Sequence, residues 1–432
     1  GNGQSGVRID GPGTRENLVW KNHIGTDMNG TAAIGNDTYG ILIEDSARAN
    51  NISGNLVSGN AYGIVIRGTG SDSNFVHKNW VGLDASGLAA LPNTAHGIRI
   101  ENGARYNLVG SSSYDEANVV SGNGWSGLCT VGDSTAFNTF NFNYAGTDTS
   151  GLKAVGNVYY GAHFGGRNNW YWKNVLSGNR CGMVISGYSQ NTELIGNLIG
   201  TGRDGETPVP NAEAGIRIQD DADGVAIHNG NRIRHNHGFG VELTGSSVRR
   251  VFITQNSITA NDSGGIVLRD GANGGIAPPV IGSASSSGNL SGTAPPSCQI
   301  EIFGDDGGQG RTYLGTVYSS GAGNWSVEGL VLSAAHYTAT ATDGSKNTSE
   351  FSAPKAPPSA VHAAAAPERF RLLPNHPNPF NPATLISFAL PEPSGVTLEI
   401  LDLRGRRIER RDCGRFEAGF HEIEWEAKDG SR

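Results

Sequence analysis

A glycine followed by an apolar–any–apolar triplet recurs along the first two-thirds of the chain, and this repeat limits the possible folds more than any other feature. The motif begins at Gly6, Gly40, Gly63, Gly97, Gly127, Gly161, Gly182, Gly215, Gly240 and Gly265. Its intervals are 34, 23, 34, 30, 34, 21, 33, 25 and 25 residues, so a unit of 21 to 25 residues is often lengthened by about ten. Such a unit holds two or three short strands and cannot bury its apolar face alone, so neighbouring units must stack.

A second motif, built on asparagine, lies between successive triplets, as in Asn51-Ile52-Ser53-Gly54-Asn55. Of 39 Asn residues, 32 precede residue 266. Asn tolerates left-handed backbone, and its amide can bond the equivalent amides in the units above and below. The sequence therefore predicts inward-facing Asn ladders at the turns. The 64 Gly residues argue against long helices, because each interior Gly costs a helix about 1 kcal/mol.

Period-2 alternation predicts which side chains of each triplet face outward. Ile98 and Ile100 are expected inside a stack of parallel strands, and Arg99 outside. The same register predicts one outward row: Arg8, Leu42, Val65, Arg99, Cys129, His163, Val184, Arg217, Glu242 and Val267. This row carries no convergent set of carboxylate, Arg and His or Lys side chains.

The extra ten residues form a Gly-x-Asp loop, with the carboxylates at Asp27, Asp84, Asp148 and Asp204. Stacked carboxylates could hold calcium, since hard cations prefer oxygen ligands. Asp is also a turn former before a left-handed Gly, and this explains the same residues without metal. We favour the turn and expect no cofactor, with calcium as the alternative.

Together, the glycine triplets and the Asn-x-Ile-x-Gly-Asn segments resemble the right-handed parallel β-helix repeat of the pectin-lyase-like architecture, across roughly residues 1–275. The Gly-Thr-Asp-x-x-Gly loop is similar to that of a subgroup of bacterial surface repeat proteins. The resemblance implies an all-β chain, with about nine to ten coils in residues 1–276 followed by two small antiparallel β-sandwiches. Leucine-rich and propeller arrays have signatures that are absent here.

The repeat stops at Ala277-Pro278-Pro279, and residues 277–354 show alternating strands with Gly, Asp and Ser turns. This segment resembles bacterial immunoglobulin-like modules. Residues 355–367 are a Pro/Ala-rich linker. From Glu368 the composition changes, since 21 of the last 65 residues are charged.

Residues 368–432 contain Asn378-Pro379-Phe380-Asn381-Pro382 and, after an alternating strand, Asp402-Leu403-Arg404-Gly405-Arg406. This combination resembles the C-terminal sorting domain of type IX secretion cargo and the related fold of flagellar hook-capping proteins. The resemblance implies the secretion machinery as a partner. That family continues beyond Trp425 through two more strands, so we expect a truncated domain. The start without Met, inside the repeat, predicts missing sequence at the other end as well.

The formal net charge of −8 gives no electrostatic signal for nucleic acid, and no apolar run is long enough to span a membrane. The four Cys residues are too scattered for a disulfide framework or a zinc motif. The resemblances imply an extracellular or outer cell-surface location.

Relatives of this architecture include polysaccharide lyases and hydrolases, so the resemblance raises the possibility of catalytic residues. The densest polar stretch offers Asp220, Asp221, His228, Arg232 and Arg234. Paired carboxylates could act as acid and base, and Arg with His could neutralise a uronate and abstract its proton. However, the galacturonidase-like Gly-His-Gly is absent, and Arg232 follows Asp221 by only eleven residues. Turn and surface roles are favoured for these residues.

Aromatic residues concentrate in one unit, where exposed rings could stack on sugar faces. The candidate glycan-binding residues are Tyr160, His163, Trp170 and Trp172, and packing inside the protein is the alternative. The favoured function is a non-catalytic β-helix protein that acts in adhesion or binds a polysaccharide or cell-surface glycan. A polysaccharide lyase or hydrolase is the alternative, and a structural stalk is a third possibility.

Overall fold

The computed structural model describes residues 1–187, 189–285, 287–330, 335–357, 367, 369–378, 383–402 and 404–427. Three predicted segments lie partly or wholly outside these ranges. They are most of the linker, residues 379–382 of the Asn-Pro-Phe-Asn-Pro motif, and the last five residues. The chain forms two compact units, Gly1–Pro357 and Pro358–Arg432. Each is described by itself.

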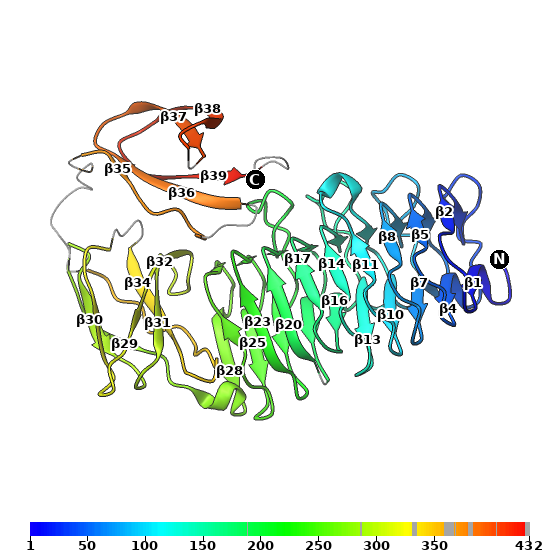
Figure 1. Cartoon of the computed structure of the whole chain (residues 1–432), viewed down its shortest axis with the longest axis horizontal. Helices are drawn as coiled ribbons and strands as arrows, with labels where there is room; N and C mark the ends of the chain where they lie inside the picture. Colours follow the sequence, from blue (N-terminus) through cyan, green and yellow to red (C-terminus); the bar gives the residue numbers. More distant parts are fainter. Residues whose placement is uncertain are drawn as a thin grey trace. The chain divides into compact units, whose positions relative to one another are not determined.

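The larger unit begins with a parallel β-helix whose coils each contribute one strand to three parallel sheets (Figure 1). The first sheet has ten strands: β1 (Ser5–Asp10), β4 (Tyr39–Glu44), β7 (Tyr62–Arg67), β10 (Ile98–Glu101), β13 (Leu128–Val131), β16 (Tyr160–Phe164), β19 (Cys181–Ile185), β22 (Ile216–Ile218), β25 (Phe239–Thr244) and β28 (Gly264–Arg269). The second has nine: β2 (Leu18–Trp20), β5 (Asn51–Ser53), β8 (Phe75–His77), β11 (Leu108–Gly110), β14 (Thr139–Asn141), β17 (Trp170–Trp172), β20 (Gln190–Ile195), β23 (Asp223–His228) and β26 (Phe252–Ile253). The third also has nine: β3 (His23–Ile24), β6 (Leu56–Val57), β9 (Trp80–Val81), β12 (Val119–Val120), β15 (Tyr144–Ala145), β18 (Val175–Leu176), β21 (Leu198–Ile199), β24 (Arg232–Arg234) and β27 (Ser257–Thr259).

The strand register places the glycine triplets on one another, as the sequence predicts. Ile64 pairs with Ile41 on one side and with Ile98 on the other, and all three side chains are fully buried. Inward-facing residues of all three sheets form one continuous hydrophobic core along the coils. The only helices among the described residues are the 3-10 turns η1 (Tyr114–Glu116) and η2 (Ala272–Gly275), so the chain is all-β.

Three Asn ladders mark the three corners of the coils and confirm the predicted amide stacking. In a typical rung, Asn60 donates its backbone N–H and its Nδ2–H to Asn93 Oδ1, at 3.0 and 3.1 Å. The ladder between the first and second sheets contains Asn17, Asn50, Asn74, Asn107, Asn138 and Asn169. The ladder between the second and third contains Asn22, Asn55, Asn79, Asn118, Asn143, Asn174, Asn197, Asn231 and Asn256. The ladder between the third and first contains Asn36, Asn60, Asn93, Asn123, Asn157, Asn179, Asn211, Asn236 and Asn261.

The Gly-x-Asp loops follow β3, β9, β15 and β21, so they occur on alternate coils. Each loop bonds the next one across the short coil between them: Gly30 O accepts the N–H of Ala85, and Gly87 O accepts the N–H of Thr149, at 2.9 and 3.2 Å. Gly87 has a φ of +71°, and a Cβ there would lie 2.4 Å from the Thr149 side chain. Glycine is therefore required at this position both by the backbone conformation and by the close approach of the next loop.

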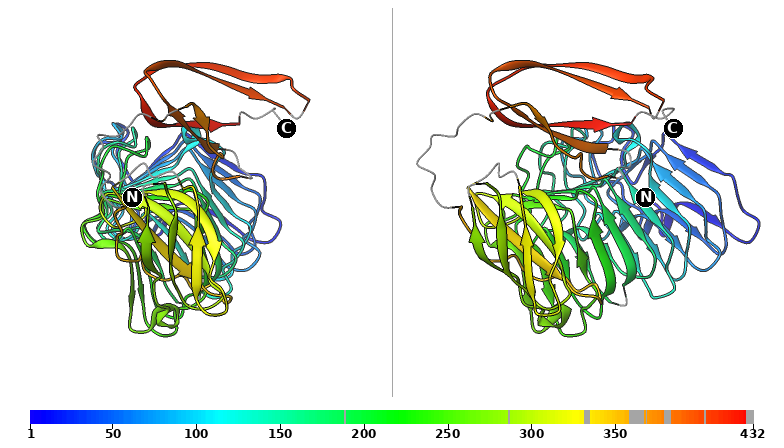
Figure 2. Two further views of the ribbon diagram at one scale, coloured as in Figure 1. Left: turned by 90° about the vertical axis from the view of Figure 1, so that its left-hand side faces the viewer. Right: turned by 60° about the vertical axis from the view of Figure 1, so that its left-hand side comes forward.

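Two three-stranded antiparallel sheets follow the β-helix in the same unit. One contains β29 (Val280–Ala284), β30 (Leu290–Thr293) and β33 (Asn324–Val327). The other contains β31 (Gln299–Asp305), β32 (Thr312–Tyr318) and β34 (His336–Thr342). Viewed from this end of the unit, their strands lie in front of the coils (Figure 2).

This antiparallel module continues the bonding pattern of the last coil. Gln309 takes the place of the next rung of an Asn ladder, since its Oε1 accepts from Asn261 Nδ2 at 3.1 Å and its Nε2 donates to Asn261 O at 2.9 Å. Gly310 and Ile258 exchange two backbone hydrogen bonds. Glu301, which is buried, accepts from Thr254 Oγ1 and from the N–H of Gln255. The module thus supplies hydrogen-bond partners to polar groups at the edge of the last coil.

The smaller unit contains two antiparallel sheets. One is formed by β35 (Arg371–Leu372), β36 (Ala383–Leu390) and β39 (Gly419–Glu426), and the other by β37 (Ser394–Leu401) and β38 (Arg407–Phe416). Asp402 closes the turn between β37 and β38, because its carboxylate accepts the N–H groups of Arg404 and Arg406, both at 2.9 Å. Gly405 in this turn has a φ of +78°, which explains the Asp-x-x-Gly-Arg pattern locally.

Candidate functional site

The outer face of the first sheet carries the outward row that alternation predicts. Strand pairing aligns Arg8, Leu42, Val65, Arg99, Cys129, His163, Val184, Arg217, Glu242 and Val267 in that order. Several of these outward side chains are nevertheless buried, because larger neighbours cover them: Tyr160, for example, packs over Val184 and Cys181. Where these members are buried, the accessible surface of the face is formed by neighbouring residues.

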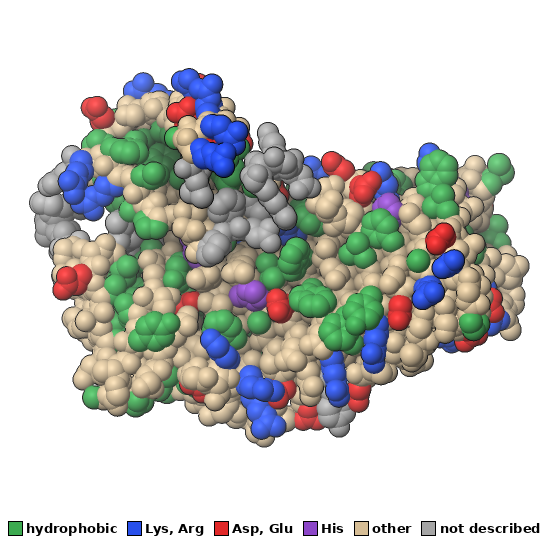
Figure 3. Space-filling model, in the orientation of Figure 1, with side chains coloured by type: hydrophobic (Ala, Val, Ile, Leu, Met, Phe, Trp, Pro, Cys, Tyr) green, Lys and Arg blue, Asp and Glu red, His purple; other side chains and the backbone are tan. Residues whose placement is uncertain are grey.

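An aromatic row covers one side of this face, and we define it as Tyr39, Tyr62, His96, Trp125, Tyr159 and Tyr160. Ring centroids of Tyr39 and Tyr62 lie 5.7 Å apart, those of Tyr62 and His96 6.2 Å, and those of His96 and Trp125 5.2 Å. Trp125 and Tyr159 lie on adjacent coils and are exposed, at 51% and 40%. Figure 3 shows hydrophobic side chains gathered over the middle of the first sheet, with Lys and Arg side chains beside them.

Carboxylates on the other side of the face are each held by arginine. Glu44 contacts Arg8 at 2.8 Å and Arg67 at 2.5 Å. Glu101 contacts Arg99 at 2.6 Å. These carboxylates lie beside guanidinium groups, and such pairing stabilises the ionised form.

The same pairing continues farther along the sheet. Glu242 lies between Arg217 and Arg269, at 2.9 Å from each. Although partial burial opposes it, hydrogen bonds from Arg180 and Arg217 hold the pKa of Glu213 below its usual value. A general acid needs a raised pKa, so this carboxylate is poorly suited to that role.

Two histidines on this face have lowered pKa values: His96, which belongs to the aromatic row, and His163, which lies beside Tyr160. Burial, with Arg99 and His163 nearby, lowers the pKa of His96 to about 3. Burial also lowers the pKa of His163, whose Nε2 lies 2.7 Å from Ser186 Oγ. Both imidazoles are therefore neutral near pH 7 and act there as hydrogen-bonding groups rather than as cations.

The four predicted glycan-binding residues fall on two faces. Tyr160 and His163 lie on β16 in the first sheet, and Trp170 and Trp172 lie on β17 in the second. Between the two tryptophans, Tyr171 points inward, is fully buried, and stacks on Phe164 with ring centroids 3.7 Å apart. The structure therefore does not bring the four residues together.

The five candidate catalytic residues are also dispersed. Asp220 and Asp221 form the turn after β22, with positive φ angles of 52° and 63°. His228 ends β23 in the second sheet, 3.6 Å from Glu193. Arg232 and Arg234 lie on β24 in the third sheet and both contact Glu206. Because these residues belong to a turn and two different sheets, they form no common site.

The four loop aspartates bond their own loops. Asp148 Oδ1 accepts from Ser150 Oγ at 2.7 Å and from the N–H of Lys153 at 3.2 Å. Hydrogen bonds from the N–H groups of Ala32 and Thr31 lower the pKa of Asp27. Asp84 and Asp204 accept in the same way, from Ser86 and Thr207. These hydrogen bonds are those expected of a turn-forming aspartate, and calcium binding stays the untested alternative.

Within the described ranges, no group of three or more His, Cys, Asp or Glu side chains is arranged to hold a metal ion. Over the same residues, no helix is long and apolar enough to cross a membrane.

Sequence reasoning missed Tyr39, Tyr62, His96 and Trp125. The first three immediately precede the glycine of the repeated triplet, at Gly40, Gly63 and Gly97, and Tyr160 does so at Gly161. The recurrence of an aromatic residue at this position in four coils was the available signal, whereas Trp125 lies two positions before Gly127 and gave no such signal.

No family model matches the chain, and no curated protein matches it. Among solved structures, the chain is similar to the crystal structure of full-length tailspike protein 2 from Escherichia coli O157:H7 bacteriophage CAB120, at 11% identity with a TM-score of 0.27. The match covers 96% of this chain and 64% of the length of that one. A likeness at this level carries no information on activity, so the functional argument rests on the side chains.

Proposed function

We propose that this chain is an extracellular or surface-displayed β-helix protein that binds a glycan on the aromatic row, without catalysis. The supporting observation is the row itself, which places rings from consecutive coils along one face of a rigid sheet. Coils repeat about every 4.8 Å, so a polysaccharide that lies along the axis contacts several rings at once. Stacking a sugar on these rings is favourable because it buries the apolar area of the rings.

The charged side of the face supports binding over catalysis. Glu44, Glu101, Glu213 and Glu242 are each paired with at least one arginine. Paired charges of this kind present hydrogen-bonding groups to sugar hydroxyls, whereas glycoside cleavage needs two carboxyl groups with different protonation states.

For the whole chain we propose the organisation that the resemblances imply. Residues 1–276 form the β-helix, residues 277–354 an immunoglobulin-like module, and residues 355–367 a linker. Residues 368–432 form a sorting-type domain that contacts the secretion machinery. This last assignment rests on the Asn-Pro-Phe-Asn-Pro and Asp-x-x-Gly-Arg motifs, the second of which forms the turn between β37 and β38.

Retention on insoluble glycans and affinity electrophoresis in soluble ones test the binding face. The variant Trp125→Ala with Tyr159→Ala removes the two most exposed rings of the row and should abolish retention. Leu88→Ala, which removes an exposed apolar side chain from a loop, is the control and should bind normally. Trp170→Ala with Trp172→Ala tests the second sheet and should leave retention unchanged.

Full retention of the Trp125/Tyr159 variant would overturn the proposal, and loss confined to the Trp170/Trp172 variant would move the binding face to the second sheet. Incubation with uronate polymers, followed by absorbance of unsaturated products, tests the enzymatic alternative. Product above background would overturn the non-catalytic part of the proposal.

A further inference from the structure

The corner between the first and second sheets carries two clefts that the proposed function does not use. At this corner each ladder Asn is preceded by a residue with positive φ, as at Ser73, Tyr106 and Phe137 (58°, 55° and 57°). In this conformation the side chain points away from the coil and out to solvent. The size of that side chain therefore decides whether the corner is filled or open.

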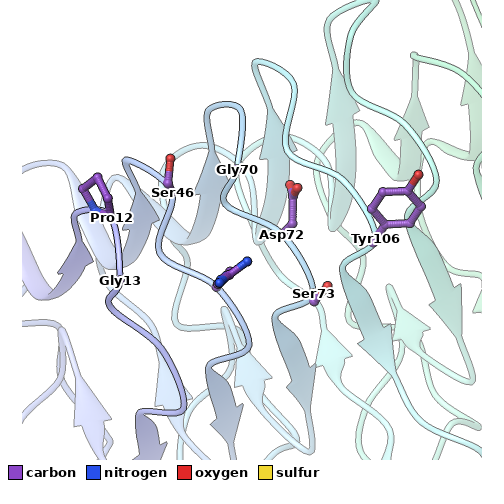
Figure 4. A pocket seen from close by; sticks show the side chains of 8 residues that line it. Pro12, Gly13, Ser46, Gly70, Asp72, Ser73 and Tyr106 are labelled. Atoms are coloured by element: carbon purple, nitrogen blue, oxygen red, sulfur yellow. The ribbon is translucent and has the colours of Figure 1, made fainter.

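The first cleft has a volume of about 400 Å³ and is lined by Pro12, Gly13, Ser46, Arg48, Gly70, Asp72, Ser73 and Tyr106. It is open because Ser73 is small where the next coil has Tyr106, so one face of that ring forms the end wall. Figure 4 shows Tyr106 and Pro12 at opposite ends, with Asp72 and Ser73 between them. The volume lies within the range of small-ligand sites, about 300–1,000 Å³.

The second cleft, of about 350 Å³, repeats this chemistry and is lined by Arg105, Asp133, Ser134, Ala136, Phe137, Arg167 and Asn168. Tyr106 and Phe137 stack on one another, with centroids 5.2 Å apart and planes within 9°. This ring pair separates the clefts, and each ring lines one of them. Each cleft therefore combines an aromatic wall with arginine, one aspartate and at least one serine hydroxyl.

Arginine recurs at this corner. Arg15, Arg48, Arg105 and Arg167 each lie two positions before a ladder Asn, and the last three, which line the clefts, are on alternate coils. Two coil repeats make this spacing about 10 Å. Over the described residues, none of the three guanidinium groups has an ion-pair partner, whereas the arginines on the first sheet face do. Arg105 Nε donates to Ser134 O at 3.2 Å, but a backbone carbonyl does not neutralise its charge. Guanidinium groups without an ion-pair partner favour carboxylate or sulfate ligands through paired hydrogen bonds.

The nearby carboxylates do not cancel this charge. Asp72 Oδ1 accepts the backbone N–H of Arg105 at 2.8 Å, and Asp133 is exposed. Among the residues that line the two clefts, three arginines outnumber two aspartates, which gives a net charge of +1 on a chain whose formal net charge is −8. Aspartate oxygens accept hydrogen bonds from sugar hydroxyls, and serine hydroxyls can donate to them or accept from them.

We propose that this corner is a two-subsite tract for an acidic oligosaccharide, with one sugar ring against Tyr106, another against Phe137, and anionic groups on Arg48, Arg105 and Arg167. This site and its charged ligand class are separate from the aromatic row. Either proposal can therefore fail while the other holds.

Affinity electrophoresis and calorimetry on the full chain test the tract, with polygalacturonate and chondroitin sulfate as carboxylate and sulfate probes. A neutral glucan and a single-stranded oligonucleotide are the comparison ligands. Arg48→Gln with Arg167→Gln should weaken binding of the acidic probes at least tenfold. Tyr106→Asn, which keeps a residue that tolerates positive φ, should weaken it several-fold. Lys153→Gln removes one exposed positive charge elsewhere and should change nothing.

Binding should also weaken steeply with added salt, and Trp125→Ala with Tyr159→Ala should leave it intact. Unchanged affinity of the double arginine variant for both acidic probes would overturn the tract. Equal loss of neutral glucan binding in that variant would overturn charge recognition, and tighter binding of the oligonucleotide than of either acidic glycan would overturn the ligand class. Affinity for only one acidic probe would support the tract and identify the anionic group.

Discussion

Replacing Asn118 with alanine tests whether the Asn ladders hold the coils together. Asn118 is fully buried, and its Nδ2 donates to Val76 O at 2.8 Å and to Asn143 Oδ1 at 2.9 Å. Its Oδ1 accepts the backbone N–H and the Nδ2–H of Asn79, at 3.1 and 3.0 Å. One side chain therefore connects three consecutive rungs.

Alanine would leave the buried N–H of Asn79 without an acceptor and remove one donor from Asn143 Oδ1. Each orphaned buried group costs about 1–3 kcal/mol, and the vacated space adds to this. We expect a loss of about 3–6 kcal/mol in the free energy of unfolding, which is a large fraction of the roughly 5–15 kcal/mol typical of domains. Asn118→Asp keeps the shape but loses both donors and buries a charge, so it should cost at least as much.

Urea denaturation followed by circular dichroism and by tryptophan fluorescence measures the loss. Asn29→Ala, at an exposed loop position, is the control and should stay within about 0.5 kcal/mol of the parent protein. A loss below about 1 kcal/mol for Asn118→Ala, or one equal to that of the control, would refute the idea that the ladder stabilises the coils.

Three further predictions concern Gln309 of the antiparallel module, His96 and the Gly-x-Asp loops. Gln309→Ala removes the final rung, so amide hydrogen exchange should accelerate in the last coil, at Ile258, before the rest of the β-helix; uniform exchange would contradict this. The pKa of His96 falls from 6.5 to about 3 on folding, so the unfolded chain takes up its proton first and stability should drop as the pH falls from 6.5 toward 3. His96→Gln should reduce this drop in thermal melts, and an unchanged pH profile would contradict the assignment. Millimolar calcium should leave the melting temperature of the parent protein and of Asp148→Asn unchanged, since the carboxylate already bonds its loop; a rise for the parent alone would favour calcium.

The coil architecture could be predicted because the information for it is local and repeated. Alternation within one triplet places Ile98 inside and Arg99 outside, and parallel stacking copies that choice into the neighbouring coils. The ladders follow for the same reason, since an Asn at a fixed position in each unit can meet only its equivalents.

The candidate site was harder to predict, because aromatic residues that are close together in the sequence are not the ones that lie close together in the structure. Tyr160 and Trp172 are twelve positions apart, yet they lie in different sheets. Tyr39 and Tyr62 are 23 positions apart, yet their rings touch. In a stacked coil, the informative comparison is between equivalent positions of successive units.

The antiparallel module that follows the last coil lies outside the repeat and has no periodic sequence signal. Gln309 is 48 positions from Asn261, and only the folded antiparallel module brings the two amides together. Alternating strands in residues 277–354 predict a module, but nothing in that pattern indicates which of its side chains would replace an Asn rung.

The loops on alternate coils also define how the β-helix can change in length. Gly30 O accepts the N–H of Ala85, and Gly87 O accepts the N–H of Thr149, each across one intervening coil. The smallest segment that can be inserted or deleted without breaking these loop contacts is therefore a pair of coils. Deleting one coil would place two ten-residue loops on adjacent turns or leave a gap between them. Deleting a pair would restore the same neighbours, so shortened or extended forms should fold only in double steps.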